Sequence, residues 1–177
     1  MQEKKNTKRI NIMITGHRPN KLWGYDLEQK PYFLLKNRIE DELVKITDDK
    51  PFRMISGMAL GVDMLYALLA LDLKDMYNVE LFCTVPCKGQ ATNWNFYDKR
   101  IYYSTLKKAD NVYYVNDCKY FDGCMQERNQ FMVDLCDYAI AVWDGSSGGT
   151  SDTVNRIKKA NKPLIIINPF QRQRSLF

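Results

Sequence analysis

The 177-residue sequence contains no apolar run of the roughly 20 residues that a membrane-spanning helix needs. Its first ten residues, MQEKKNTKRI, also lack the apolar stretch of a secretory signal peptide. We therefore expect a cytoplasmic protein with no membrane partner. The chain is 45% apolar or aromatic, which is enough to bury the core of one compact domain.

Metal-binding side chains are scarce. The chain has one histidine and five cysteines, and no two cysteines form a C-x-x-C pair. An odd number of cysteines, most of them within predicted strands or helices, argues against a disulfide framework or a zinc site. We expect no metal, and we interpret the cysteines as reduced, small core residues.

The formal net charge of +5 is concentrated at the two ends of the chain. Residues 1–9 carry +3, residues 162–177 carry another +3 with no acidic residue, and the body between them is left at about −1. A basic nucleic-acid-binding face is therefore not supported, and nucleic acid is not the expected partner.

Predicted strands and helices alternate along the whole chain. The strands are apolar runs at 9–16, 52–56, 79–86, 111–116, 138–145 and 163–169. The helical patterns lie at 31–46, 62–75, 93–109, 124–137 and 151–161. This alternation predicts an α/β fold: a single Rossmann-like domain with a mostly parallel sheet and helices on both faces.

Glycines follow two of the strands, in SGMALGVD (56–63) and DGSSGGT (144–150). In such sheets ligands bind beyond the carboxyl ends of the strands, and the next helix presents free N–H groups to an anion. A phosphate-bearing ligand is the favoured interpretation, and glycines that only shape tight turns are the alternative. Neither stretch is a Walker A or G-x-G-x-x-G motif, so ATP hydrolysis and NAD redox chemistry lose support and no cofactor is expected.

Two charged residues occupy apolar helix faces. Asp63 shares a face with Ala67 and Ala70, and Arg128 is followed by Met132 at helical spacing. A buried carboxylate needs a donor, and a buried guanidinium needs an anion. The spacing leaves two readings open: an internal salt bridge of Arg128, to Asp63 or Asp144, or contacts to a ligand.

Most candidate ligand-binding residues belong to the predicted carboxyl edge of the sheet, and Arg128 and Asn129 belong to the predicted helix 124–137. They are Gly16, His17, Arg18, Ser56, Gly57, Met58, Gly61, Asp63, Trp94, Arg128, Asn129, Asp144, Gly148, Gly149 and Thr150.

From about Ile12 to Pro169 the chain resembles the YpsA-like branch of the SLOG superfamily of bacteria and phages. The resemblance is carried by TGHRPNKLWGY, ISGMALGVD, PCKGQATNW, CMQERNQFMVD and AVWDGSSGGTSDTV in this order. It implies one SLOG-type Rossmann-like domain over residues 1–177. From the charge distribution we expect basic, flexible ends at 1–9 and 170–177. It also implies a nucleotide or nucleotide-derived ligand.

Two further likenesses bear on activity. SGMALGVD is similar to a stretch of DNA-processing protein A, which handles single-stranded DNA. The Lonely Guy enzymes cleave the N-glycosidic bond of nucleoside monophosphates with an arginine and a glutamate. This chain is similar to them over the stretch MQERNQFMVDLCDYAIAVWDG…GGT. Arg128 matches that arginine, but Thr153 stands where the glutamate is expected. Asp152, one position earlier, is rotated by about 100° on a helix.

The leading hypothesis is therefore a nucleotide-binding protein that senses or sequesters its ligand. The enzyme alternative is an N-glycosidase or phosphoribohydrolase, with Arg128, Asp152 and Asp63 as candidate catalytic residues. A DNA-processing accessory protein is the second alternative. A homodimer is what the related enzymes imply.

Overall fold

A single six-stranded sheet organises the protein, which was analysed as a computed structural model describing residues 8–171. The strands are β1 (Ile10–Gly16), β2 (Phe52–Ser56), β3 (Val79–Cys87), β4 (Asn111–Asn116), β5 (Tyr138–Val142) and β6 (Leu164–Ile167). The helices are η1 (Pro19–Lys21), α1 (Lys30–Thr47), α2 (Val62–Leu73), α3 (Phe96–Lys108), α4 (Cys124–Leu135) and α5 (Gly149–Lys159). Among the described residues, no helix is both long enough and apolar enough to cross a membrane.

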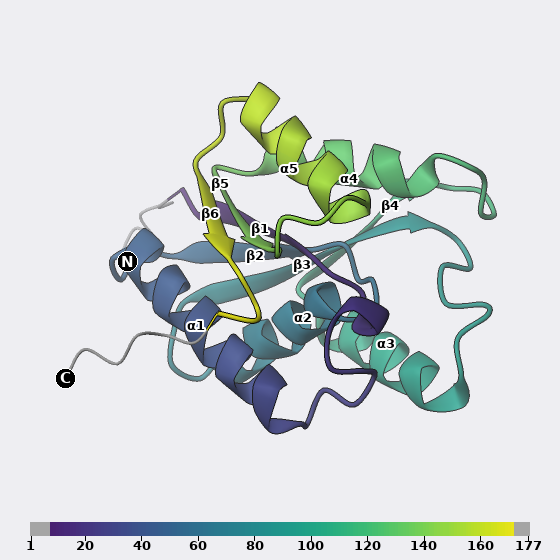
Figure 1. Ribbon diagram of the computed structural model, residues 1–177, viewed down its shortest axis with the longest axis horizontal. Helices are drawn as coiled ribbons and strands as arrows, with labels where there is room; N and C mark the ends of the chain where they lie inside the picture. The colour runs from purple at the N-terminus through teal and green to yellow at the C-terminus, as the bar shows by residue number, and fades with distance from the viewer. Residues whose placement is uncertain (1–7, 172–177) are drawn as a thin grey trace, which may run out of the picture.

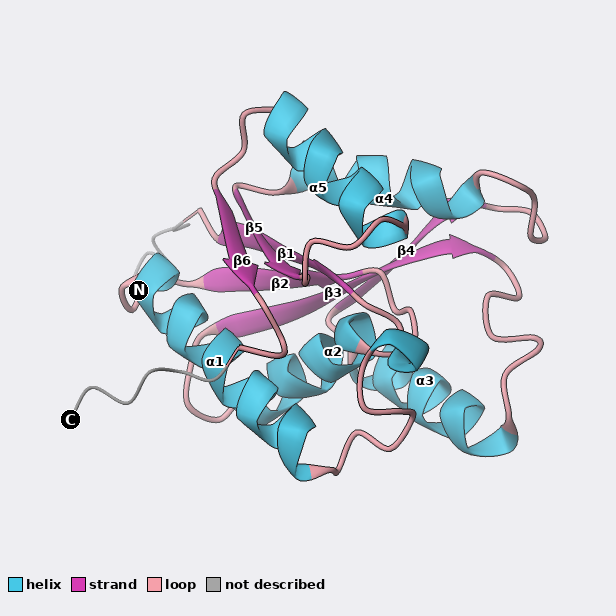
Figure 2. Ribbon diagram, viewed as in Figure 1, coloured by secondary structure: helices cyan, strands magenta, loops and turns pink. Residues whose placement is uncertain are grey.

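All neighbouring strands pair in parallel, in the order β4-β3-β2-β1-β5-β6. Helices α1, α2 and α3 cover one face of the sheet, and α4 and α5 cover the other (Figure 1). Figure 2 shows the magenta strands enclosed between these two cyan layers. The predicted Rossmann-like α/β fold is confirmed.

Burial on both faces explains why the strands are continuous apolar runs. Successive strand residues point to opposite faces. In β1, Ile12 and Ile14 join the larger core cluster together with residues of α1 and α2. Met13 points the other way and joins Met132 of α4 and Ile157 of α5 in a second cluster. Each face therefore has its own apolar core, and no strand needs a polar side.

Two boundaries on either side of the glycine-rich loop differ from the sequence prediction. The predicted strand 138–145 ends at Val142, because the chain then turns where the Asp144 carboxylate accepts the Ser146 N–H (2.9 Å). The predicted helix 151–161 begins earlier, at Gly149. Most of the ends that we expected to be flexible lie outside the described residues. Of the described part, Arg9 forms an ion pair with Glu80 (2.8 Å), and the ring of Phe170 packs on Trp23.

Two glycines in the loop between β2 and α2 allow close packing. A Cβ on Gly57 would overlap the Arg128 guanidinium. Gly61, the N-cap of α2, has a φ of 95°, and a Cβ there would lie 2.6 Å from the His17 carbonyl oxygen. This segment therefore carries little side-chain bulk because Arg128 and the loop after β1 press directly against its backbone.

We expect Gly61→Ala to destabilise the protein more than Gly123→Ala. Gly123 is the matched control: it is the N-cap of α4 with a φ of 103°, and a Cβ there would meet no atom within 4 Å. Both substitutions incur about 1–3 kcal/mol of backbone strain, and the contact with His17 adds about 1 kcal/mol or more for Gly61 alone. Urea unfolding measures the difference, and equal losses would contradict the packing explanation.

Candidate functional site

A cavity of about 610 Å³ opens at the carboxyl ends of β1 and β5. These strands are neighbours in the sheet although three strands separate them in the sequence, so the cavity lies at the topological switch point where such folds bind ligands. Its lining comprises Ile14, Thr15, Gly16, His17, Arg18, Asn20, Lys21, Ala59, Asp63, Met125, Gln126, Arg128, Asn129, Ser147, Gly148, Gly149, Thr150, Asp152 and Arg156.

Arg128 and Asp63 meet at one side of the cavity. The Arg128 side chain is 4% exposed, and its Nη1 lies 3.7 Å from Asp63 Oδ2 and donates a hydrogen bond to the Gly57 carbonyl oxygen. Its Nε donates to Asn129 Oδ1 (2.8 Å). No acceptor within residues 8–171 hydrogen-bonds Nη2, so this nitrogen remains available to a ligand. The salt-bridge reading and the ligand reading of Arg128 are therefore compatible.

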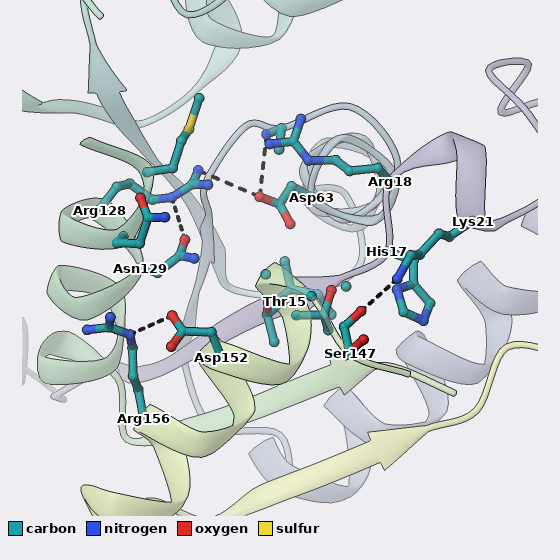
Figure 3. A pocket seen from close by; sticks show the side chains of 18 of the residues that line it. Thr15, His17, Arg18, Lys21, Asp63, Arg128, Asn129, Ser147, Asp152 and Arg156 are labelled. Atoms are coloured by element: carbon teal, nitrogen blue, oxygen red, sulfur yellow. Dashed lines mark hydrogen bonds and ion pairs between the residues drawn. The ribbon is translucent and has the colours of Figure 1, made fainter. Parts of the chain in front are cut away.

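Burial governs the electrostatics of this pair. It raises the pKa of the Asp63 carboxyl, while Arg128, Arg18 and the Ala59 N–H act in the opposite direction. Burial also lowers the pKa of Arg128, opposed by Asp63. In Figure 3 the Asp63 carboxylate lies between the guanidinium groups of Arg128 and Arg18. Each member of the pair therefore needs its partner to remain charged.

The N-terminus of α5 opens into the cavity without a side-chain cap. Its N-cap is Gly148, which has a φ of 139° and no side chain to supply an acceptor. Gly149 and Thr150, in the first turn, line the cavity, and no acceptor in the described residues bonds their N–H groups. By contrast, Asn95 caps α3 by accepting the Asp98 N–H (2.8 Å). The α5 terminus therefore retains unpaired donors and a positive partial charge.

Two contacts from the segment after β1 position this glycine-rich loop. The buried His17 hydrogen-bonds Asp144 Oδ1 through Nε2 (2.8 Å). Hydrogen bonds from Ser146 and His17 hold the pKa of Asp144 well below its usual range. Lys21 Nζ donates to the Ser147 carbonyl oxygen (2.8 Å). The segment after β1 thus holds the glycine-rich loop in place, on the side of the cavity opposite α4.

The two residues discussed for glycosidic chemistry occupy different environments. Thr153 is buried and joins the two helices: it donates to the Gly149 carbonyl oxygen (2.9 Å) and accepts from Asn129 Nδ2 (2.9 Å). Asp152 lines the cavity, and its Oδ2 accepts a hydrogen bond from Arg156 Nε (2.8 Å; Figure 3). The carboxylate at this end of the cavity is therefore Asp152.

Most of the sequence-predicted residues come together around this cavity. Those in its lining are Gly16, His17, Arg18, Asp63, Arg128, Asn129, Gly148, Gly149 and Thr150, with Asp152 from the catalytic candidates.

The other six predicted residues lie outside the lining. Ser56 Oγ accepts the Met58 N–H (3.1 Å), which holds Met58 at a φ of 57°. Gly57 and Gly61 provide the close packing described above, and Asp144 holds His17. Trp94 packs in the larger core, with its ring 5.2 Å from that of Tyr102.

Sequence reasoning missed several lining residues, chiefly Lys21, Met125, Gln126, Ser147 and Arg156. Arg156 follows the candidate Asp152 by four residues, so helical spacing places both on one face and could have identified it. Gln126 precedes Arg128 by two residues and lies on another face, so spacing could not place it in the cavity. Within the described residues, no three His, Cys, Asp or Glu side chains are grouped to hold a metal ion.

The fold and the position of the cavity define a Rossmann-like α/β protein with a cavity at its topological switch point. The YspA SLOG family model matches residues 12–172, so the chain belongs to this family. The resemblance to the YpsA-like branch of the SLOG superfamily is thereby confirmed.

The chain is also similar in sequence to two bacterial proteins and in structure to one solved protein. It is 29% identical over 126 residues to the uncharacterized SPbeta prophage-derived protein YoqJ of Bacillus subtilis (strain 168), covering 64% of this chain and 74% of the relative. It is 27% identical over 142 residues to the UPF0398 protein YpsA of the same organism, covering 78% of each chain. A structure of DNA processing protein A from Helicobacter pylori, described for its single-stranded DNA binding mode, matches with a TM-score of 0.61. That match has 19% identity and covers 94% of this chain and 67% of the other, so it shows a shared fold.

We expect Arg128→Met to destabilise the protein by about 3–5 kcal/mol, because it leaves the Asp63 carboxylate buried without its partner. The double variant Arg128→Met/Asp63→Asn should regain part of this loss, with a coupling of about 0.5–3 kcal/mol. Urea unfolding of both single variants and the double variant measures this coupling. Strictly additive losses would show that the pair does not interact.

The same variants carry a pH signature. Without Arg128, the pKa of Asp63 should rise further, and a carboxyl that is protonated in the folded state needs no partner. When the folded-state pKa of a carboxyl lies above its unfolded-state pKa of about 3.9, protonation stabilises the fold at low pH. This stabilisation is lost as the pH rises from the unfolded-state pKa through the folded-state pKa. The deficit of Arg128→Met should therefore be larger at pH 7 than at pH 4. A deficit independent of pH would assign the loss to packing alone.

Proposed function

We propose that the protein binds a nucleotide or nucleotide-derived ligand in this cavity and senses or sequesters it. The observation that carries the proposal is the uncapped N-terminus of α5 within a cavity lined by four cationic side chains and two carboxylates. Helix N-termini bind phosphate through free N–H groups and the helix dipole. The cavity volume also lies within the range of about 300–1,000 Å³ that is common for small-molecule sites.

The chemistry of the walls suggests how such a ligand would lie. The phosphate would meet the N–H groups of Gly149 and Thr150, with Lys21 alongside. Met125 and Ala59 offer apolar surface to a nucleobase. Asp63 and Asp152 can each accept hydrogen bonds from ribose hydroxyls. Each part of a nucleotide therefore has a complementary group in the lining.

Nucleic acid is the rival ligand, because the structural neighbour from Helicobacter pylori is described for binding single-stranded DNA. We nevertheless propose a small molecule, since the cationic groups converge on a cavity and the excess positive charge of the sequence lies at its two ends. Tight binding of single-stranded DNA that persists at physiological salt would favour the rival.

A thermal-shift screen over nucleoside mono-, di- and cyclic phosphates tests the proposal. At a hundredfold excess over its Kd, a bound nucleotide adds about 2.7 kcal/mol, which raises the Tm of a chain of this size by roughly 5–10 °C. Gly149→Val should abolish the shift. A Cβ on Gly149 meets no atom within 4 Å, so the fold accommodates the side chain while it obstructs the cavity.

Ser151→Val is the matched control, because Ser151 lies in the same helical turn but outside the lining. It should retain the full ligand-induced shift. The proposal is refuted if no nucleotide produces a shift, or if Gly149→Val responds as the natural protein does.

The enzyme alternative is tested by release of free base. Asp152 presents a carboxylate to the cavity, but its pairing with Arg156 and the threonine at 153 differ from the arginine–glutamate arrangement of the Lonely Guy enzymes. We expect no base release from AMP, GMP, CMP or UMP above a control without protein. Release that Asp152→Asn stops would instead make the protein an N-glycosidase with Asp152 as its catalytic carboxylate.

A further inference from the structure

A second cavity, of about 450 Å³, lies beside α4 and α5. It is lined by Gln130 from α4, by Asp152, Asn155, Arg156 and Lys159 from α5, and by Ala160, the C-cap of α5. Asp152 and Arg156 line both cavities, so the two spaces meet at this ion pair. Both side chains are partly exposed, at 48% and 32%, and can rearrange around a ligand.

The groups that surround the second cavity favour an anion. Arg156 Nη1 donates to Gln130 Oε1 (3.0 Å), which places the guanidinium between the two helices. Lys159 adds a second positive charge and Asn155 an amide donor, whereas Gln130 Nε2 donates to Asp134 Oδ1 (2.8 Å). Asp152 is the one acidic residue in this lining, and Arg156 neutralises it.

The spacing along α5 suits a ligand that crosses from one cavity into the other. Helical side chains lean toward the helix N-terminus, and the Arg156 side chain does so: its Nε hydrogen-bonds Asp152. Asp152 in turn follows Gly149 by three residues. At 1.5 Å per residue, the guanidinium therefore lies about one helical turn beyond the proposed phosphate position at Gly149. A nucleoside placed over Asp152 would bridge the two anionic positions.

We propose that the ligand is a nucleotide bearing a second phosphate, held by Arg156 and Lys159 in the cavity between α4 and α5. This inference rests on the proposed function, because the first phosphate must occupy the N-terminus of α5. The second phosphate is either terminal, as in a nucleoside 3′,5′-bisphosphate, or part of a phosphodiester to another nucleoside. Both forms present an anionic phosphate to Arg156, with about two negative charges when it is terminal and about one when it is a phosphodiester.

The test compares the Kd of AMP and GMP with those of the corresponding 3′,5′-bisphosphates and of the dinucleotides pApA and pGpG, by isothermal titration calorimetry. A charged hydrogen bond to the second phosphate should tighten binding about tenfold over the monophosphate. If only the bisphosphates gain affinity, the phosphate is terminal. If the dinucleotides gain as much or more, it is a phosphodiester.

Lys159→Met should lower the affinity ratio of bisphosphate to monophosphate from about ten toward one, since it removes one of the two charges. Lys158→Met is the matched control: Lys158 is exposed on the same helical turn and lines neither cavity, so the ratio should persist. Equal Kd values for mono- and bisphosphates, or equal effects of the two lysine variants, would overturn the inference and leave the proposed function standing. If none of the nucleotides binds, the proposed function fails as well.

Discussion

The guanidinium of Arg128 rests on the Gly57 carbonyl oxygen and beside the Asp63 carboxylate, and this buried contact joins α4 to α2 and to the loop after β2. These elements lie on opposite faces of the sheet, so the contact closes the molecule around the carboxyl ends of the strands (Figure 1). Gly57 has no side chain because the guanidinium occupies that space. A buried ion pair is stable only when each member has a close partner of opposite charge and further hydrogen bonds. Arg128 therefore both holds the cavity wall in place and keeps a donor facing the cavity.

The order of the strands decides which loops meet at the site. The chain builds the sheet outward from β1 to β4 and then returns to add β5 and β6 on the other side of β1. The loops after β1 and β5 consequently face each other, and His17 and Lys21 hold the glycine-rich loop by direct contacts. The same order carries the loop after β3 away from the cavity. For this reason Trp94 belongs to the core.

Much of the fold follows from the sequence, because apolar runs alternating with amphipathic patterns define the strands and helices of a doubly covered parallel sheet. Asp63 and Arg128 were also identifiable, since charged residues on apolar faces need partners. Strand order is not encoded in local patterns, so the sequence could not separate Gly149, which faces the cavity, from Gly61, which packs on His17. Lys21 was missed for a related reason, because only the tertiary arrangement turns it toward the site. Arg156 lies four residues after the candidate Asp152, so helical spacing could have identified it.

The central claim is that the N-terminus of α5 holds the phosphate of a nucleotide. The most direct measurement is an amide ¹H–¹⁵N NMR titration of the protein with AMP and, separately, with adenosine. The claim predicts large shifts of the Gly149 and Thr150 amide signals with AMP and much smaller ones with adenosine, because only AMP carries the phosphate that accepts those N–H groups. Shifts that are equal for the two ligands, or confined to residues away from the cavity such as those of β4, would contradict it.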